Sequence, residues 1–111
     1  HRLLDPDYYQ SFDDSLLKAH YISTVKLMMK MYQFGAFAFH PSALKGALER
    51  LRIFIEFLKQ KPIDCNALIE DNLKTLKNFA KLNFPVNSEV SSAIKSEFDQ
   101  FFLGLAHPEE N

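Results

Sequence analysis

The residues of this 111-residue chain that could do chemistry are four histidines and one cysteine: His1, His20, His40, His107 and Cys65. Imidazole and thiolate groups bind metals or act as bases and nucleophiles when several of them converge. No Glu-x-x-His or His-x-x-x-His spacing puts two ligands on one helix face, and a lone cysteine makes neither an internal disulfide nor a zinc site. We therefore expect no metal, no cofactor and no catalytic residue, so the chain is not expected to be an enzyme.

The histidines can be given structural positions. His20 falls near the secondary apolar side of an expected helix, where we expect it to be partly buried. The order His40, Lys45, Gly46 resembles that of histidine phosphotransfer domains, which are four-helix bundles of about this size. The spacing differs by two residues, and Pro41 follows the histidine directly. A phosphotransfer role in signalling is the remote alternative that this resemblance implies.

Prolines divide the chain at near-regular intervals, at Pro41, Pro62, Pro85 and Pro108. Because proline lacks the N–H that a helix interior needs, each one marks a helix edge, and apolar residues recur at helical spacing between them. The pattern predicts four helices, at about residues 12 to 34–39, 41–60, 64–82 and 88–106, and a short helical turn over residues 5–10 that begins with Asp5 and Pro6. The expected capping residues are Ser11 with Asp14, Asp64 and Asn87, and Gly35 is the expected end of the first long helix.

The apolar stripes of the four helices differ in width. The second helix has a main stripe of Leu44, Leu48, Leu51, Ile55 and Leu58, whereas Ile53 and Phe57 point nearly the opposite way. The first helix also has a wide apolar arc, whereas the third and fourth are one-sided. This pattern favours an all-α, up-and-down four-helix bundle formed by one domain, residues 1–111. The alternative is two stacked helical hairpins, as in a solenoid, where each helix touches neighbours on two sides.

Composition and charge exclude several classes of protein. The chain is 47% apolar and 24% charged with a net charge of −1, which is typical of a globular protein rather than a disordered one. Lys26 and Lys30 interrupt the most hydrophobic stretch, so we expect a soluble, cytoplasmic protein that does not enter a membrane. The first two helices are basic, but their charges lie on different faces and the pI is about 6.5, which disfavours nucleic acid as a partner.

The surplus apolar faces of the first two helices carry the functional hypothesis. They predict a non-enzymatic protein–protein interaction module, of the adaptor, scaffold or chaperone-like kind, that buries these faces against a protein partner or in a homodimer. The predicted contact residues are Leu27, Met31 and Phe34 on the first helix and Ile53 and Phe57 on the second. The alternative is a domain that binds a small apolar ligand in a pocket lined by Met28, Met29, Met31, Phe34 and Phe37. A competing interpretation places both faces inside the fold, with the second helix sandwiched between its neighbours.

Overall fold

The computed structural model describes residues 5–33, 41–62, 64–82 and 88–106, and it confirms the all-α prediction. The described residues form the helices α1 (Pro6–Tyr9), α2 (Asp14–Gln33), α4 (Pro41–Gln60), α5 (Asn66–Leu82) and α6 (Ser88–Ala106), with no strand among them. As the proline spacing predicted, α4 begins at Pro41 and Pro62 lies in the bend that follows it. The predicted helix end at Gly35 and the predicted cap at Asn87 lie outside the described residues.

The short helix α1 begins as the sequence predicted. Asp5 has extended backbone angles, and its side chain accepts a hydrogen bond from the backbone N–H of Asp7 at 3.0 Å. Pro6 follows as the first helical residue, where its missing N–H costs nothing. At the other end, the N–H of Gln10 donates to the carbonyl of Pro6 at 3.0 Å and closes the turn. Asp5 therefore acts as the predicted N-cap.

The predicted cap of α2 is wrong. Ser11 was expected to cap this helix, but the carboxylate of Asp13 accepts the hydrogen bond from the N–H of Leu16, at 2.8 Å. The reason is the turn that closes α1: the N–H of Phe12 donates to the carbonyl of Tyr9 at 3.1 Å, so Ser11 belongs to that turn. The capping role passes to the first suitable side chain after the turn.

The start of α5 is shifted by one residue from the prediction. The N–H of Ile69 donates to the carbonyl of Cys65 at 2.9 Å, so Cys65 occupies the backbone position of the cap. The carboxylate of Asp64 accepts a hydrogen bond from the N–H of Asn66 at 3.4 Å. Asp64 thus lies one residue before the capping position that was predicted for it. Asp64 therefore contributes its charge to the helix start without being the capping residue itself.

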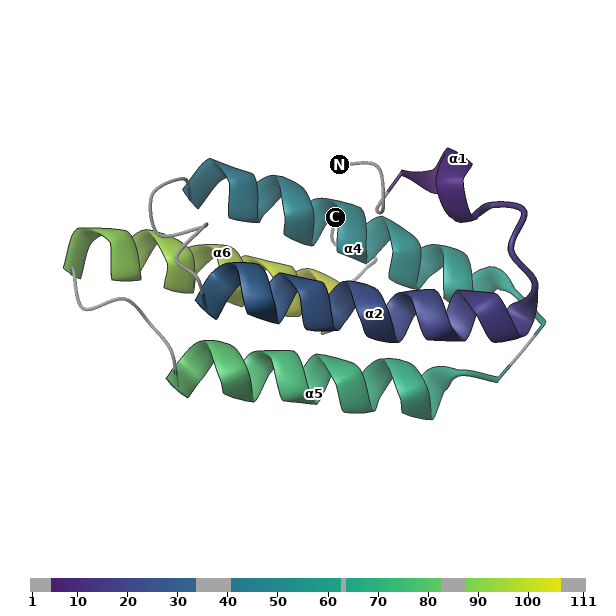
Figure 1. Cartoon of the computed structure of the whole chain (residues 1–111). Coiled ribbons are helices and arrows are strands. Elements are labelled where there is room, and N and C mark those ends of the chain that lie inside the picture. Colours follow the sequence, from purple (N-terminus) through teal and green to yellow (C-terminus); the bar gives the residue numbers. More distant parts are fainter. Residues whose placement is uncertain (1–4, 34–40, 63, 83–87, 107–111) are drawn as a thin grey trace.

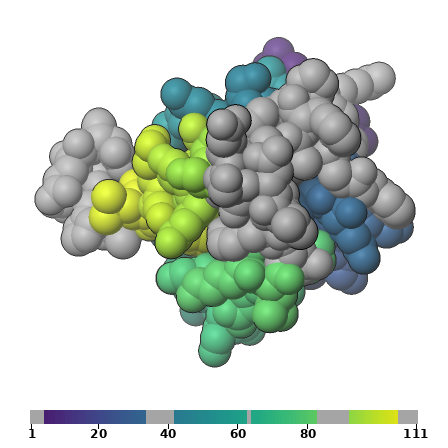
Figure 2. Space-filling view, turned by 90° about the vertical axis from the view of Figure 1, so that its left-hand side faces the viewer, coloured from purple at the N-terminus to yellow at the C-terminus, as the bar shows by residue number. Residues whose placement is uncertain are grey.

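Consecutive long helices run antiparallel, as an up-and-down bundle requires (Figure 1). The closest backbone approaches, however, are between α2 and α5 and between α4 and α6, and Figure 1 shows that each of these pairs runs parallel. Seen from one end, the helices surround the core in the order α4, α6, α5, α2 (Figure 2). The bundle thus has up-and-down order, and it packs the hairpin α2–α4 against the hairpin α5–α6, as the stacked-hairpin alternative describes.

The core lies where the apolar stripes meet. The buried apolar side chains of the long helices are Leu17, Tyr21, Val25, Met28 and Tyr32 in α2, Leu44, Leu48, Leu51, Phe54, Ile55 and Leu58 in α4, Ile69, Leu73, Leu76 and Ala80 in α5, and Ile94, Phe98 and Phe101 in α6. The hydroxyl of Tyr21 donates to the carbonyl of Ile69 at 3.1 Å and joins α2 to α5 inside this core. None of the helices in the described part of the chain combines the length and apolarity needed to cross a membrane.

Candidate functional site

The residues that could do chemistry are not brought together in the described part of the chain. Residues 5–33, 41–62, 64–82 and 88–106 contain no group of three or more His, Cys, Asp or Glu side chains placed to hold a metal ion. Cys65 is buried, with its thiol 4.0 Å from the carbonyl of Leu58. His20 is half-buried, as expected, whereas His1, His40 and His107 lie outside the described residues. The phosphotransfer alternative rests on His40 and is not addressed by this part of the structure.

Helix α4 carries a second stripe beside its core stripe. Ala47, Arg50, Phe54 and Phe57 follow one another at spacings of three and four residues, so they share one flank of the helix. Phe54 is fully buried and Phe57 is half-buried and packs against the core. Phe57 was predicted to point almost opposite the core, and Phe54 was assigned to neither stripe. The regular spacing of this second stripe was the signal that was missed.

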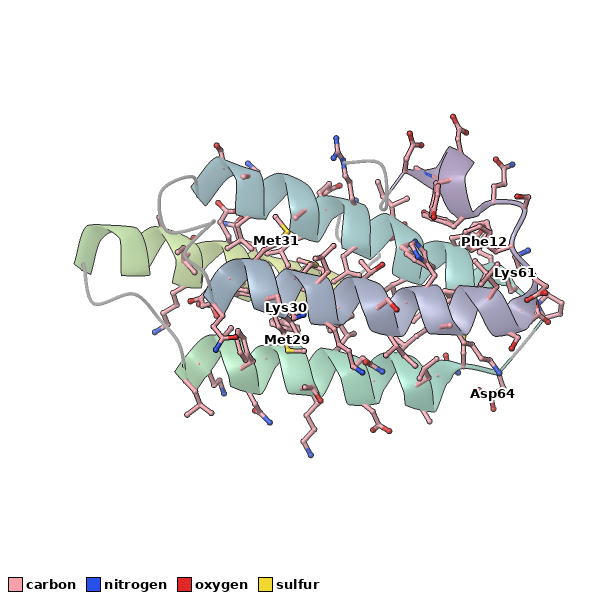
Figure 3. All side chains as sticks on the ribbon, viewed as in Figure 1. Phe12, Met29, Lys30, Met31, Lys61 and Asp64 are labelled. Atoms are coloured by element: carbon pink, nitrogen blue, oxygen red, sulfur yellow. The ribbon has the colours of Figure 1, made fainter. Side chains whose placement is uncertain are left out.

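Helix α2 presents a matching stripe to α4. His20, Thr24, Leu27 and Met31 also recur at spacings of four and three, and the ring of His20 lies 5.3 Å from the ring of Phe54, centroid to centroid. Because His20 contacts Phe54, the stripe that contains His20 lies on the side of α2 that faces α4. In Figure 3, Met31 points toward α4, whereas Met29 points toward α5. Leu27 and Met31 therefore lie on the α4 side of the first hairpin, and both are half-buried.

An aromatic cluster fills one end of the first hairpin. It consists of Tyr8, Tyr9, Phe12, His20, Phe54 and Phe57. The ring of Tyr9 stacks on Phe54 at 4.2 Å with 12° between the planes, and it meets the edge of Phe57 at 5.2 Å. Tyr8 and Phe12 each lie 5.5 Å from the ring of His20. Because Tyr8, Tyr9 and Phe12 precede α2, this cluster attaches the N-terminal segment to the hairpin.

Tyr9 is the central side chain of the aromatic cluster. It is 0% exposed, and its hydroxyl oxygen is buried without a hydrogen-bond partner among the described residues. Burial raises the pKa of this phenol, and the nearby charge of Asp5 raises it further. The sequence predicted only a local turn for α1 and did not indicate that Tyr9 is buried, because a four-residue helix has no periodicity from which a buried face can be read.

The predicted contact residues occupy two kinds of environment. Ile53 is 39% exposed on the outside of α4. Leu27 and Met31 are half-buried, and Phe57 is covered on one side by Tyr9 while the ammonium of Lys61 lies 5.1 Å from its ring centroid. Phe34 lies outside the described residues. We call Leu27, Met31, Ile53 and Phe57 the first-hairpin face, and its role as an interface stays a prediction.

Charge on α4 is distributed unevenly. Its two acidic residues, Glu49 and Glu56, both bond to the guanidinium of Arg52, with the Glu56 contact at 2.7 Å. The bond to Glu49 is the main cause of the raised pKa of Arg52. Arg50 lies instead one helical turn before Phe54, and the ammonium of Lys61, just after the end of α4, lies over the ring of Phe57. The side of α4 that faces the N-terminal segment is therefore basic and aromatic.

The methionines predicted to line a ligand pocket point in different directions. Met28 is buried in the core, Met29 points toward α5, and Met31 points toward α4 (Figure 3). Phe34 and Phe37 lie outside the described residues. Three side chains that diverge around one helix favour core packing and surface contacts over a shared ligand cavity.

Comparison with protein-family models, with curated proteins and with solved structures finds no match for this chain.

Proposed function

We propose that this chain is a non-enzymatic protein–protein interaction module, of the adaptor, scaffold or chaperone-like kind, and that it binds through the first-hairpin face. The observation that supports this most is the exposure of the apolar side chain of Ile53 on the outside of α4, with partly exposed apolar side chains on the neighbouring α2. Ile53 is 39% exposed beside the fully buried Phe54, and Leu27 and Met31 are half-buried on the facing helix. Exposed apolar side chains that gather on one face are typical of interfaces.

The partner is a protein, either a different one or a second copy of this chain. An α-helical hairpin presents ridges of side chains that fit another helix or an extended segment, whereas a small apolar ligand needs an enclosed cavity. The proposal also places the protein in the cytoplasm as a soluble domain, because its lone cysteine is buried and suits a reducing compartment.

The test is to replace exposed members of the first-hairpin face and to compare them with a matched residue elsewhere. Leu27→Ser with Ile53→Ser changes two apolar side chains of this face, and Leu103→Ser changes one on α6 that is 61% exposed. A photo-crosslinking amino acid in place of Met31 reports which protein lies against the face in the native host. We expect one crosslinked species, a dimer or a heteromer, that Leu27→Ser with Ile53→Ser removes and Leu103→Ser leaves.

The folding control is the circular dichroism spectrum and the urea midpoint of each variant. Serine at two positions that are already partly exposed is expected to leave both nearly unchanged. The proposal fails if the folded double variant gives the same crosslinked species as the unchanged chain. It also fails if sedimentation and crosslinking find a monomer with no species at residue 31.

A further inference from the structure

The segment that carries α1 is held on the hairpin by one buried side chain. Tyr9 is the buried residue of α1, while Asp5, Pro6, Asp7 and Gln10 are exposed. Backbone hydrogen bonds from Tyr8 to Asp5, from Gln10 to Pro6 and from Phe12 to Tyr9 close the segment on itself. The turn is thus built locally, and its attachment to α2 and α4 is made by rings that stack in the aromatic cluster.

The fit of Tyr9 is imperfect in a specific way. Its ring is matched by Phe54 at 4.2 Å and by Phe57 at 5.2 Å, but its hydroxyl is buried without a hydrogen-bond partner among the described residues. A buried hydroxyl that finds no partner opposes docking, because it loses its bonds to water. A phenylalanine ring would keep the stacking without that loss. The site therefore suits an aromatic side chain that lacks the hydroxyl better than the one it holds.

The charges of the segment and of its site are complementary. The turn carries Asp5 and Asp7, and Asp13 follows it as the cap of α2. Beside Phe57, which contacts Tyr9, the ammonium of Lys61 lies over the ring at 5.1 Å, and Arg50 lies one helical turn before Phe54 on α4. The site thus selects for an aromatic side chain that acidic residues accompany.

We propose that α1 is an intramolecular occupant of a docking site formed by His20, Phe54 and Phe57, and that the site receives from a protein partner an acidic helical turn bearing a phenylalanine, which displaces Tyr9. This inference rests on the proposed function and specifies the chemistry of the partner. Because α1 is tethered through residues 10–13, a free segment competes against an effective concentration in about the millimolar range. Removing the Tyr9 side chain should therefore raise the apparent affinity of the chain for a free peptide that binds this site.

The test uses the full chain and a defined peptide. The probe is a fluorescent peptide with the sequence of residues 4–13 and phenylalanine in place of Tyr9, titrated by anisotropy. We expect it to bind the Tyr9→Ala chain at least about tenfold more tightly than the unchanged chain, because the competing side chain is gone. A second peptide with alanine at both tyrosine positions should not bind. Leu103→Ala in the Tyr9→Ala background is the matched control and should keep the affinity.

A measurement on the unchanged chain covers the case in which Tyr9→Ala does not fold. Excess phenylalanine peptide should speed hydrogen exchange at the amides of Tyr8, Gln10 and Phe12, because their turn leaves its site and frays. The inference is overturned if those amides keep their exchange rates at saturating peptide, or if the folded Tyr9→Ala chain binds the peptide no better than the unchanged chain. Loss of the peptide effect while Leu27→Ser with Ile53→Ser still removes the crosslinked partner would overturn this inference alone.

Discussion

Three buried tyrosines allow the same single-atom change to be made in opposite environments. The hydroxyl of Tyr21 donates to the carbonyl of Ile69 at 3.1 Å, across the contact between α2 and α5. The hydroxyls of Tyr9 and Tyr32 are buried without a hydrogen-bond partner among the described residues. Tyrosine to phenylalanine removes one oxygen and keeps the ring in each case. The structure therefore predicts opposite signs for the change in unfolding free energy.

The magnitudes follow from the hydrogen-bond environment. Tyr21→Phe loses one net hydrogen bond and should lower the free energy of unfolding by about 0.5–1.5 kcal/mol. Tyr32→Phe removes a hydroxyl whose burial is not compensated and should raise it by roughly 1 kcal/mol. Each kcal/mol corresponds to about 4–8 °C in Tm for a domain of nearly this size. Tyr9→Phe should also stabilise, and its effect should be confined to the attachment of α1.

The assay is urea unfolding of the three variants beside the unchanged chain, with the slope m compared to show that the same surface is exposed. A midpoint for Tyr32→Phe that falls as far as that for Tyr21→Phe would refute the reasoning, because it would show that the Tyr32 hydroxyl is bonded. Thermal melts at equal concentration should give the same order: Tyr32→Phe highest, the unchanged chain next, and Tyr21→Phe lowest.

Alkaline pH gives an independent check on Tyr32. Burial raises the pKa of its phenol to about 12, from an ordinary value of 10.0. Between these two values the unfolded phenol loses its proton while the folded one keeps it, so the unfolded state binds fewer protons and stability falls as pH rises. Tyr32→Phe removes this contribution. Its midpoint should therefore fall less than that of the unchanged chain between pH 10 and pH 12.

Three further substitutions test local features of the fold. Gly46→Ala should stabilise by about 0.5–1 kcal/mol, because Gly46 lies inside α4 and no atom stands within 4 Å of the position a Cβ would take; thermal melts measure this gain. Asp13→Ala should cost about 1 kcal/mol through loss of the α2 cap, whereas Ser11→Ala should cost almost nothing, and equal losses in the two midpoints would contradict the assigned cap. Phe54→Ala should cost about 3–5 kcal/mol, against a few tenths for Ile53→Ala, and matching midpoints would show that the burial of these neighbours is misassigned.

The sequence was sufficient to predict the helices and most of the core. Proline placement and apolar spacing are local properties, so they set the start of α4 at Pro41 and the stripe from Leu44 to Leu58 without reference to any partner helix. The cap of α2 was missed for a physical reason, because Ser11 was already part of the turn that closes α1. Which candidate caps a helix depends on the geometry of the chain that leads into it.

The aromatic cluster could not be predicted in the same way. Tyr9 lies in a four-residue helix and packs against Phe54, which is 45 residues further along the chain, so no local period links the two. His20 was expected to be partly buried, and it is, but the sequence could not show that the aromatic rings of Tyr8 in α1 and Phe54 in α4 both contact it. Long-range pairing of this kind depends on how the helices dock. Ile53 was placed correctly on the outside because its exposure depends only on the position of the core stripe.

The two hairpins are joined along both of their helices. Backbones approach most closely between α2 and α5 and between α4 and α6, which ties one hairpin to the other along both helices. Within the first hairpin, the rings of His20 and Phe54 contact each other, and Tyr9 contacts both of them. Toward the start of α4, Ala47 packs against the core and Gly46 is exposed. The rings of Tyr9, His20 and Phe54 therefore connect α2 and α4 at the end of the hairpin that carries the aromatic cluster, because the close backbone contacts of both helices are made with the second hairpin.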